Sequence, residues 1–208
     1  MATFEREQLQ ASSDAMGAIG YWSETIGGNA LRSALAGEPR GNGMSLAVAC
    51  SRFNSVITNR LLRGTLKALD DNGVSGSDIT VAWVPGAFEL PLAASKLAAS
   101  GDYDAVICLG AVIRGGTGHY EFVAGQCAAG ILRAQLDTGV PVVFGVLTCD
   151  TVEQALERSG GGGIEDPGDD TTMNKGFEAA ISALEMADLL RSIPTLHRAG
   201  ATGTGAGT

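Results

Sequence analysis

The chain has 208 residues, of which 45% are hydrophobic and 18% charged, and its formal net charge at pH 7 is −9. This length and composition are typical of one globular domain with a substantial core, and they exclude a disordered chain. The negative charge argues against broad binding to nucleic acid or to an anionic membrane, and no apolar run approaches the ~20 residues that cross a bilayer.

Residues 1–43 carry scattered apolar side chains without a clear period, and "GEPRGNG" at 37–43 indicates a flexible junction. A basic start followed by an apolar core is missing, so the sequence predicts no secretory signal. We expect this region to be a partly ordered N-terminal extension.

From Met44 onward the pattern becomes regular. Four apolar runs predict strands at 45–50, 78–84, 104–113 and 141–149. Apolar residues at helical spacing predict helices at 55–73, 88–100, 119–137, 151–158 and 174–193. We therefore expect one domain at 44–193, followed by a flexible glycine-rich tail at 194–208.

Two of these helices carry specific end signals. Gly73 can end the first helix in a left-handed conformation. Thr151 can cap the start of the fourth helix, and Gln154, three residues later, can complete a capping box.

The alternation of strands and helices indicates the class of fold. The predicted strands are apolar along their whole length, as in a parallel sheet that is covered on both faces. The sequence therefore predicts a flavodoxin-like three-layer α/β/α sandwich with a four-stranded parallel sheet. Right-handed crossovers bring the carboxyl ends of all four strands to one edge, where ligands bind in such folds.

The turn "RGGTG", between the third predicted strand and His119, has two interpretations. Its glycines can aim backbone amides at an anion near a helix N-terminus, with the Thr117 hydroxyl as a further donor. The alternative is an ordinary tight turn. His119 can transfer protons near neutral pH, or it can be a hydrogen-bonded surface histidine. The other histidine, His197, lies in the predicted tail and is not expected to take part.

The other residues that follow predicted strands also have structural alternatives. Phe53 and Phe88 could stack on a flat ring at a pocket mouth, or they could pack into the core. Glu89 could accept hydrogen bonds from ligand hydroxyls, or it could stabilise a helix start. Arg158 and Lys175 could bind a phosphate, or they could remain solvated.

The four cysteines show no metal-binding spacing. We expect all of them to be buried free thiols in a reducing compartment. They are Cys50, Cys108, Cys127 and Cys149.

Five segments occur in the order and at the spacing of one enzyme family. They are "SRFN", "VPGAFELP", "GAVIRGGTGHYEF", "FGVLTCDTVEQALERSG" and "NKGFEAAISALEMA". Over residues 44–192 the chain closely resembles the lumazine synthases of riboflavin biosynthesis. The resemblance does not cover residues 1–43 or the tail.

The resemblance implies a reaction. Lumazine synthases condense 5-amino-6-(D-ribitylamino)uracil with 3,4-dihydroxy-2-butanone 4-phosphate to 6,7-dimethyl-8-ribityllumazine, and they release phosphate and water. An amine adds to a ketone, an imine forms, phosphate leaves and the ring closes. The resemblance implies that no metal and no other cofactor is needed.

The resemblance also implies which residues hold the ribitylamino substrate. Those around its pyrimidine ring would be Phe53, Val112 and Ile113. Those along its ribityl chain would be Asn54, Ala87, Phe88 and Glu89.

A second set of residues would serve the phosphorylated substrate. The resemblance implies that Gly116, Thr117 and Arg158 bind the phosphate and that Lys175 lies near it. His119 would move protons while the imine forms and the phosphate leaves. This assignment matches the interpretation of the glycine turn as an anion site.

In this family the active site lies between neighbouring subunits, and Phe144 of the adjacent chain would cover the ring. The resemblance implies a homopentamer, and some family members build sixty-subunit shells from pentamers. Residues 1–43 do not reproduce the short strand that pairs with a neighbour in shell-forming members. The choice between a pentamer and a shell therefore stays open.

The loop between Arg158 and Lys175, at 159–172, is longer than is usual in the family. It contains four acidic residues, whose charge would weaken anion binding nearby unless they face solvent. They are Glu165, Asp166, Asp169 and Asp170.

Two other functions compete with synthesis. One is a non-catalytic relative that binds a flavin or lumazine or forms a cage, which would not need both His119 and Arg158. The other is a flavodoxin-like phosphate-binding or receiver module, which would want acidic residues where this chain has "SRFN". The compartment is expected to be the bacterial cytoplasm or the plastid stroma.

Overall fold

The structure, a computed structural model, describes residues 35–164 and 171–199, except the side chains of residues 172 and 194–199. Within it, Gly37–Arg191 form one compact unit. The other described residues, 35–36 and 192–199, belong to a second unit that is made of the two ends of the chain.

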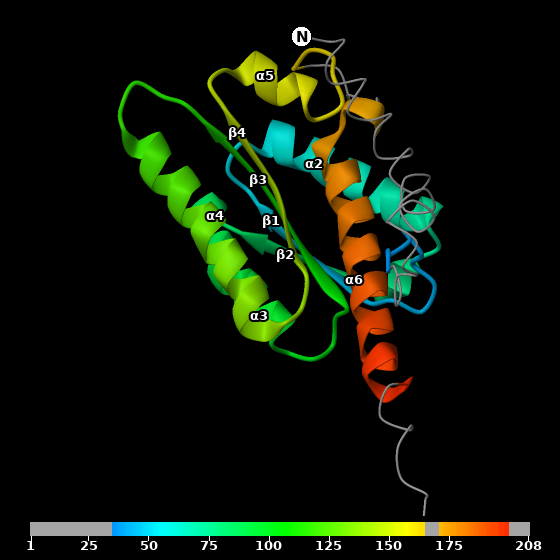
Figure 1. Cartoon of the computed structure of the whole chain (residues 1–208). Helices are drawn as coiled ribbons and strands as arrows, with labels where there is room; N and C mark the ends of the chain where they lie inside the picture. The colour runs from blue at the N-terminus through cyan, green and yellow to red at the C-terminus, as the bar shows by residue number, and fades with distance from the viewer. Residues whose placement is uncertain (1–34, 165–170, 200–208) are drawn as a thin grey trace, which may run out of the picture. The chain divides into compact units, whose positions relative to one another are not determined.

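Four parallel strands form a single sheet in the order β2-β1-β3-β4 (Figure 1). They are β1 (Leu46–Ser51), β2 (Ile79–Val84), β3 (Ala105–Ile113) and β4 (Val142–Cys149). The two central strands are almost wholly buried, whereas several side chains of the two edge strands are exposed. The predicted four-stranded parallel sheet is confirmed.

Helices cover both faces of this sheet (Figure 1). One face packs against α2 (Ser55–Asp71), α5 (Val152–Glu157) and α6 (Lys175–Ala199). The other face packs against α3 (Leu90–Ala98) and α4 (His119–Thr138). The predicted α/β/α sandwich is thereby confirmed.

Strand β3 shows why the sequence lacks an alternating pattern. Ile107 and Leu109 lie in the core on the α2–α6 face, whereas Val106 and Cys108 lie in the core on the α3–α4 face. Successive side chains of a strand point to opposite faces, and both faces are covered here. An apolar residue is therefore needed at nearly every position.

The helix ends follow the predicted signals with one difference. Gly73 follows α2 with φ of +86°, as expected of a glycine that stops a helix. The Thr151 hydroxyl accepts a hydrogen bond from the Gln154 amide at 3.3 Å and so caps α5. The Gln154 side chain accepts from the amide of Asp150 at 2.9 Å, not from that of Thr151 as a capping box requires.

The compact unit begins before the predicted domain, and helix α6 ends after the predicted helix. The unit includes residues 37–43, where the amide of Glu38 donates to the Asp188 carboxylate at 2.9 Å. Helix α6 continues past Pro194 to Ala199, into the stretch predicted as tail. A proline removes its own backbone donor and crowds the carbonyl four residues before it, which weakens a helix without always ending it.

All four cysteines are buried and free, as predicted. Burial raises the pKa of the Cys50 and Cys127 thiols to about 11. Among the described helices, none is both long enough and apolar enough to pass through a membrane. The described residues also contain no cluster of His, Cys, Asp or Glu side chains that could hold a metal ion.

Candidate active site

Hydrogen bonds join the loops at the carboxyl edge of the sheet. The amide of Phe53, after β1, donates to the carbonyl of Pro85, after β2, at 3.1 Å. The side-chain amide of Asn54 donates to the carbonyl of Ala111 near the end of β3 at 2.9 Å. The amide of Arg114, after β3, donates to the carbonyl of Cys149 at the end of β4 at 2.9 Å. The predicted convergence of these loops is therefore observed.

Asn54 has a structural role in this arrangement. It occupies the N-cap position of α2 with φ of +58°, the only positive φ of a non-glycine residue in the described chain. Asparagine tolerates this left-handed conformation better than most residues. The bond to Ala111 ties this turn, which directly follows Phe53, to β3.

The two aromatic candidates do not pack into the core of their own chain. Phe53 is 69% exposed and Phe88 is 58% exposed. The core-packing alternative is therefore wrong for both, and each leaves an apolar ring uncovered at the edge. Ala87 and Val112 are buried, and Ile113 is partly buried beneath this edge.

Glu89 lies in the first turn that leads into α3, and its carboxylate has no hydrogen-bond or ion-pair partner among the described residues. A Cβ atom at Gly86 would lie 3.2 Å from Glu89 Oε2, so a larger residue there would crowd the carboxylate. The acceptor oxygens of Glu89 are thus available to a ligand.

His119 is the first residue of α4, and Gly118 is the N-cap. His119 and Thr117 are exposed, and neither side chain has a hydrogen-bond partner among the described residues. A Cβ atom at Gly115 or Gly116 would meet nothing within 4 Å, so the space around the turn is open. An imidazole beside an open turn at a helix start can exchange protons with a bound molecule.

Arg114 holds this turn in place. Its Nε donates to Asp150 Oδ1 at 2.7 Å, a second guanidinium nitrogen donates to Glu121, and the guanidinium lies 4.1 Å from the centre of the Tyr120 ring. The hydrogen bond from Arg114 and the backbone amide of Glu121 itself hold the pKa of the Glu121 carboxyl below its usual value. No role for Arg114 was predicted from the sequence, although Asp150 after β4 and Glu121 in the first turn of α4 could have suggested one.

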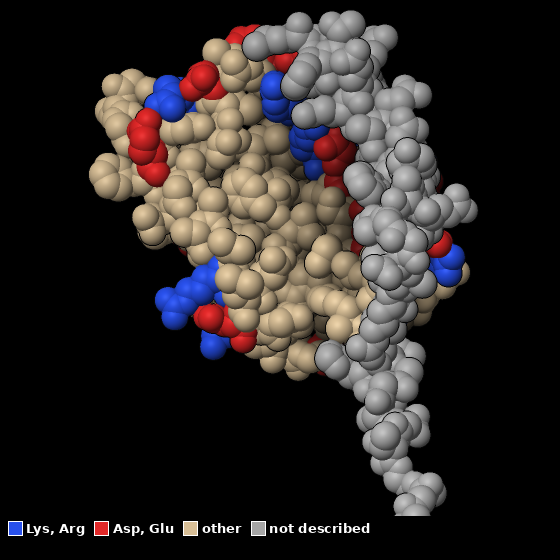
Figure 2. All heavy atoms as spheres, in the orientation of Figure 1, with Lys and Arg blue, Asp and Glu red and all other residues tan. Residues whose placement is uncertain are grey.

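A second group of predicted residues lies along β4 and α6. A pocket of about 290 Å³ is lined there by Phe144, Lys175 and Glu178, together with apolar and small residues of both elements. In the space-filling view, a mostly uncharged hollow on this side has Lys or Arg atoms and acidic atoms at its upper end (Figure 2). Phe144 is 41% exposed.

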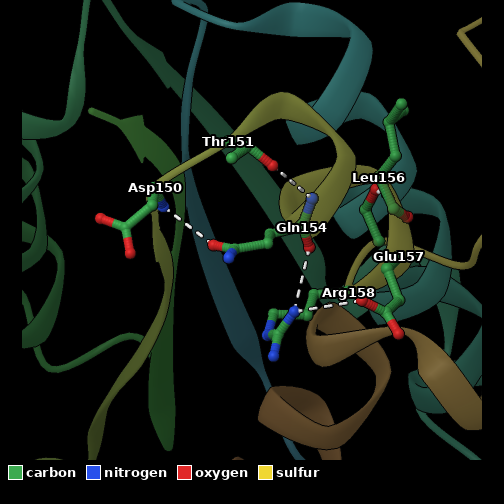
Figure 3. Close-up of polar contacts among 7 residues, drawn as sticks. Asp150, Thr151, Gln154, Leu156, Glu157 and Arg158 are labelled. Carbon is green, nitrogen blue, oxygen red and sulfur yellow. Dashed lines mark hydrogen bonds and ion pairs between the residues drawn. The ribbon is translucent and has the colours of Figure 1, made fainter. Parts of the chain in front are cut away.

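Arg158 and Lys175 are neighbours in space despite the long loop between them. The amide of Lys175 donates to the carbonyl of Arg158 at 2.9 Å. The Arg158 guanidinium returns to the end of α5, where it donates to the carbonyl of Gln154 at 3.3 Å and lies 3.5 Å from the Glu157 carboxylate (Figure 3). Lys175 Nζ lies 2.8 and 2.9 Å from the two carboxylate oxygens of Glu178.

One chain does not bring the two groups together. Phe144 is paired with Cys108, five residues before the pair Ile113 and Cys149 that ends both strands. At ~3.3 Å per residue, this places Phe144 roughly 16 Å from the carboxyl edge. Arg158 follows a helix on the α2–α6 face, whereas His119 starts a helix on the opposite face.

Two comparisons with known proteins cover most of the chain. A family model described as 6,7-dimethyl-8-ribityllumazine synthase matches residues 43–191. A protein of Syntrophus aciditrophicus (strain SB) with that same name is 56% identical over 151 residues, which are 73% of this chain and 92% of the relative. The matched range includes every predicted site residue, from Phe53 to Lys175.

Proposed function

The chain belongs to the 6,7-dimethyl-8-ribityllumazine synthase family and catalyses the lumazine-forming step of riboflavin biosynthesis, and we propose that it does so in a site shared by two neighbouring subunits. The non-catalytic alternative is not favoured, because the relative is named as a synthase. One subunit supplies the carboxyl edge with Phe53, Glu89 and His119. The next subunit supplies the pocket with Phe144 and Lys175.

The position of Phe144 carries this proposal. Its ring lies on an edge strand, 41% exposed, roughly 16 Å from the carboxyl edge of its own sheet. Phe53 on that edge is likewise uncovered. Two exposed rings that cannot meet within one chain can cover the two faces of one ligand ring when two chains meet.

On the carboxyl edge, the substrate-binding roles follow from exposure and hydrogen-bonding capacity. Phe53 stacks on the pyrimidine ring, and Val112 and Ile113 form the apolar floor. Glu89 and the backbone of Ala87 and Phe88 accept or donate hydrogen bonds along the ribityl chain. Asn54 contributes through the donor and acceptor positions that its bond to Ala111 leaves unused.

The phosphate is held from both subunits. Gly116 and Thr117 offer backbone amides and a hydroxyl from the turn at the start of α4. Arg158 of the neighbouring chain offers a guanidinium, which suits a phosphate geometrically. Lys175 adds positive charge near this group, although its own carboxylate partner Glu178 reduces that contribution.

His119 moves protons at the reacting carbon atoms. When the substrate amine adds to the ketone, the ammonium proton passes through His119 to the alkoxide oxygen. The remaining N–H proton follows the same route as the imine forms, so that this oxygen leaves as water. When phosphate leaves, the C–O electron pair goes with it and a proton is lost from the adjacent carbon. Such acid–base help is worth ~10²–10⁴-fold, and holding both substrates together supplies much of the remaining acceleration.

A further apolar surface supports assembly with copies of the same chain. On α4, Phe122, Leu132 and Leu136 are 71%, 54% and 72% exposed in the single chain. Uncovered apolar rows of this kind usually mark an interface between proteins. We propose a homopentamer on the strength of the family resemblance. The bacterial relative favours a bacterial cytoplasm over a plastid stroma.

An assay of the separated oligomeric species tests the shared site. The species are separated by size, native mass spectrometry gives the number of chains in each, and each is incubated with both substrates while lumazine fluorescence is followed. Turnover is expected only in oligomeric species, because a monomer lacks half of the site. A folded monomer that turns over as fast per chain as the oligomer would contradict the proposal.

A further inference from the structure

We propose that Arg60, a buried residue of α2, is a positioning residue for the phosphate side of the site. It acts through the glycine loop 159–163, which directly follows Arg158. The inference rests on the proposed function, because it takes Arg158 to be a phosphate ligand. Arg60 itself is not among the residues that line the described pocket.

Arg60 stands where an apolar residue is expected. It belongs to the buried row of α2 between Ile57 and Leu61, and it is 3% exposed. A buried charge is costly unless hydrogen bonds satisfy it. The guanidinium meets this need by donating to the carbonyl of Gly161 at 2.9 Å and to the carbonyl of Gly163. The planar guanidinium group can donate to two nearby carbonyls at once and so fix the positions of both.

The glycine loop has a defined shape. Gly160, Gly161 and Gly162 have φ of +110°, +72° and +74°, a run of left-handed conformations that other residues adopt at a cost. At one end, the amide of Gly161 donates to the carbonyl of Leu156 in α5 at 3.0 Å. On the other side of the loop, the Arg60 guanidinium donates to the carbonyls of Gly161 and Gly163. The backbone that follows Arg158 is therefore fixed from two sides.

Asn174, directly before α6, binds to the same loop through its side chain. Asn174 is 3% exposed. Its side-chain amide donates to the carbonyls of Arg60 and Ser159 at 3.0 and 3.1 Å. Its oxygen accepts from the amides of Gly176 and Phe177 and so caps α6. Helix α2, the glycine loop and the start of α6 thus meet directly beside Arg158. This junction explains how the long loop leaves Arg158 and Lys175 adjacent.

Kinetics of two substitutions at Arg60 test the inference. Arg60→Met removes both donors, and we expect the KM for the phosphorylated substrate and the Ki of inorganic phosphate to rise about tenfold, because small misplacements of binding groups are felt strongly. The KM for the ribitylamino substrate should change less than about twofold. Arg60→Lys can reach one carbonyl and should give an intermediate effect.

Two loop glycines offer a matched pair that leaves Arg60 intact. A Cβ atom at Gly161 or at Gly163 would meet nothing within 4 Å, but only Gly161 has a positive φ. Gly161→Ala should therefore strain the loop and raise the same two constants, whereas Gly163→Ala should leave them unchanged. If Arg60→Met does not assemble, Arg60→Lys and this pair carry the test.

Arg158→Ala, measured in parallel, separates failure of the inference from failure of the proposed site. If Arg158→Ala weakens phosphate binding while Arg60→Met and Gly161→Ala lower only the unfolding temperature, Arg60 is merely structural and the inference is wrong. If Arg158→Ala leaves the phosphate constants unchanged, the proposed phosphate site is wrong. A rise in both substrate KM values for Arg60→Met would also overturn a specific role on the phosphate side.

Discussion

Side chains at the carboxyl edge divide into those that are already bonded and those that are available. Asn54 and Arg114 connect loops to one another. His119 and Glu89 have no side-chain partner among the described residues. Reactive groups that must exchange protons or accept ligand hydroxyls are useful only when they are not already committed. In the proposed site, the bonded residues therefore support the loops, and the available side chains can reach a ligand.

The ion pair between Arg114 and Glu121 should make the stability of the fold depend on pH. The lowered pKa of Glu121 means that its pairing stabilises the folded state above the unfolded-state pKa of about 4.3, and that this contribution is lost as pH falls through the lower folded value. Arg114→Gln should reduce stability at neutral pH and have a smaller effect in acid. Urea unfolding of both proteins between neutral pH and strong acid measures this. A difference that widens in acid would contradict it.

His119→Ala should lower kcat by about 10²-fold or more, as loss of an acid–base group does, with little change in either KM. The assay is lumazine fluorescence with both substrates varied. His197→Ala is the matched control, because His197 lies beyond the compact unit, and it should retain the original kcat. An undiminished kcat in His119→Ala would remove this residue from the chemistry.

At the scale of elements, periodicity predicted the strands and helices well because each element buries one face or both. The apolar run at 104–113 became β3 with both faces covered. Positions just after strands, such as Phe53 and His119, were also predictable, since parallel strands end at one edge. Arg60 was not, because its partners Gly161 and Gly163 are more than 100 residues away in sequence. No local pattern reveals such a contact.

The contact between α2 and α6 is close enough to require a glycine. A Cβ atom at Gly176 would lie 2.1 Å from the carbonyl oxygen of Leu61. Gly176→Ala should therefore destabilise the fold by about 1–3 kcal/mol through overpacking, although alanine favours a helix by about 1 kcal/mol. Urea unfolding at a fixed chain concentration measures the change.

Gly76→Ala provides the control for this substitution. Gly76 has no atom within 4 Å of the added Cβ position and has no positive φ. It should change the free energy of unfolding by less than about 0.5 kcal/mol. If Gly176→Ala were equally mild, α6 would have room to move away from α2 and the close packing would not be needed.

For the whole molecule, the proposed shared site makes a single chain an incomplete enzyme. Phe144 with Lys175 and Phe53 with His119 occupy two surfaces that one chain does not join. The sequence alone predicted the members of both groups through family resemblance, but the pattern of residues did not reveal that they fall into two groups. That division depends on the strand register, which places Phe144 opposite Cys108.

Subunit mixing tests the shared site most directly. His119→Ala chains should have a low kcat and Arg158→Ala chains a high KM for the phosphorylated substrate, so both should be nearly inactive when that substrate is kept well below the KM of Arg158→Ala. The two variants are dissociated, mixed in equal amounts and reassembled, with each variant and the unmodified protein reassembled alone as controls. If neighbouring chains share a site, random mixing restores both residues in about a quarter of the sites, and turnover should rise to about that fraction of the unmodified protein. Turnover equal to the mean of the two variants would place His119 and Arg158 in the same chain's site and contradict the account.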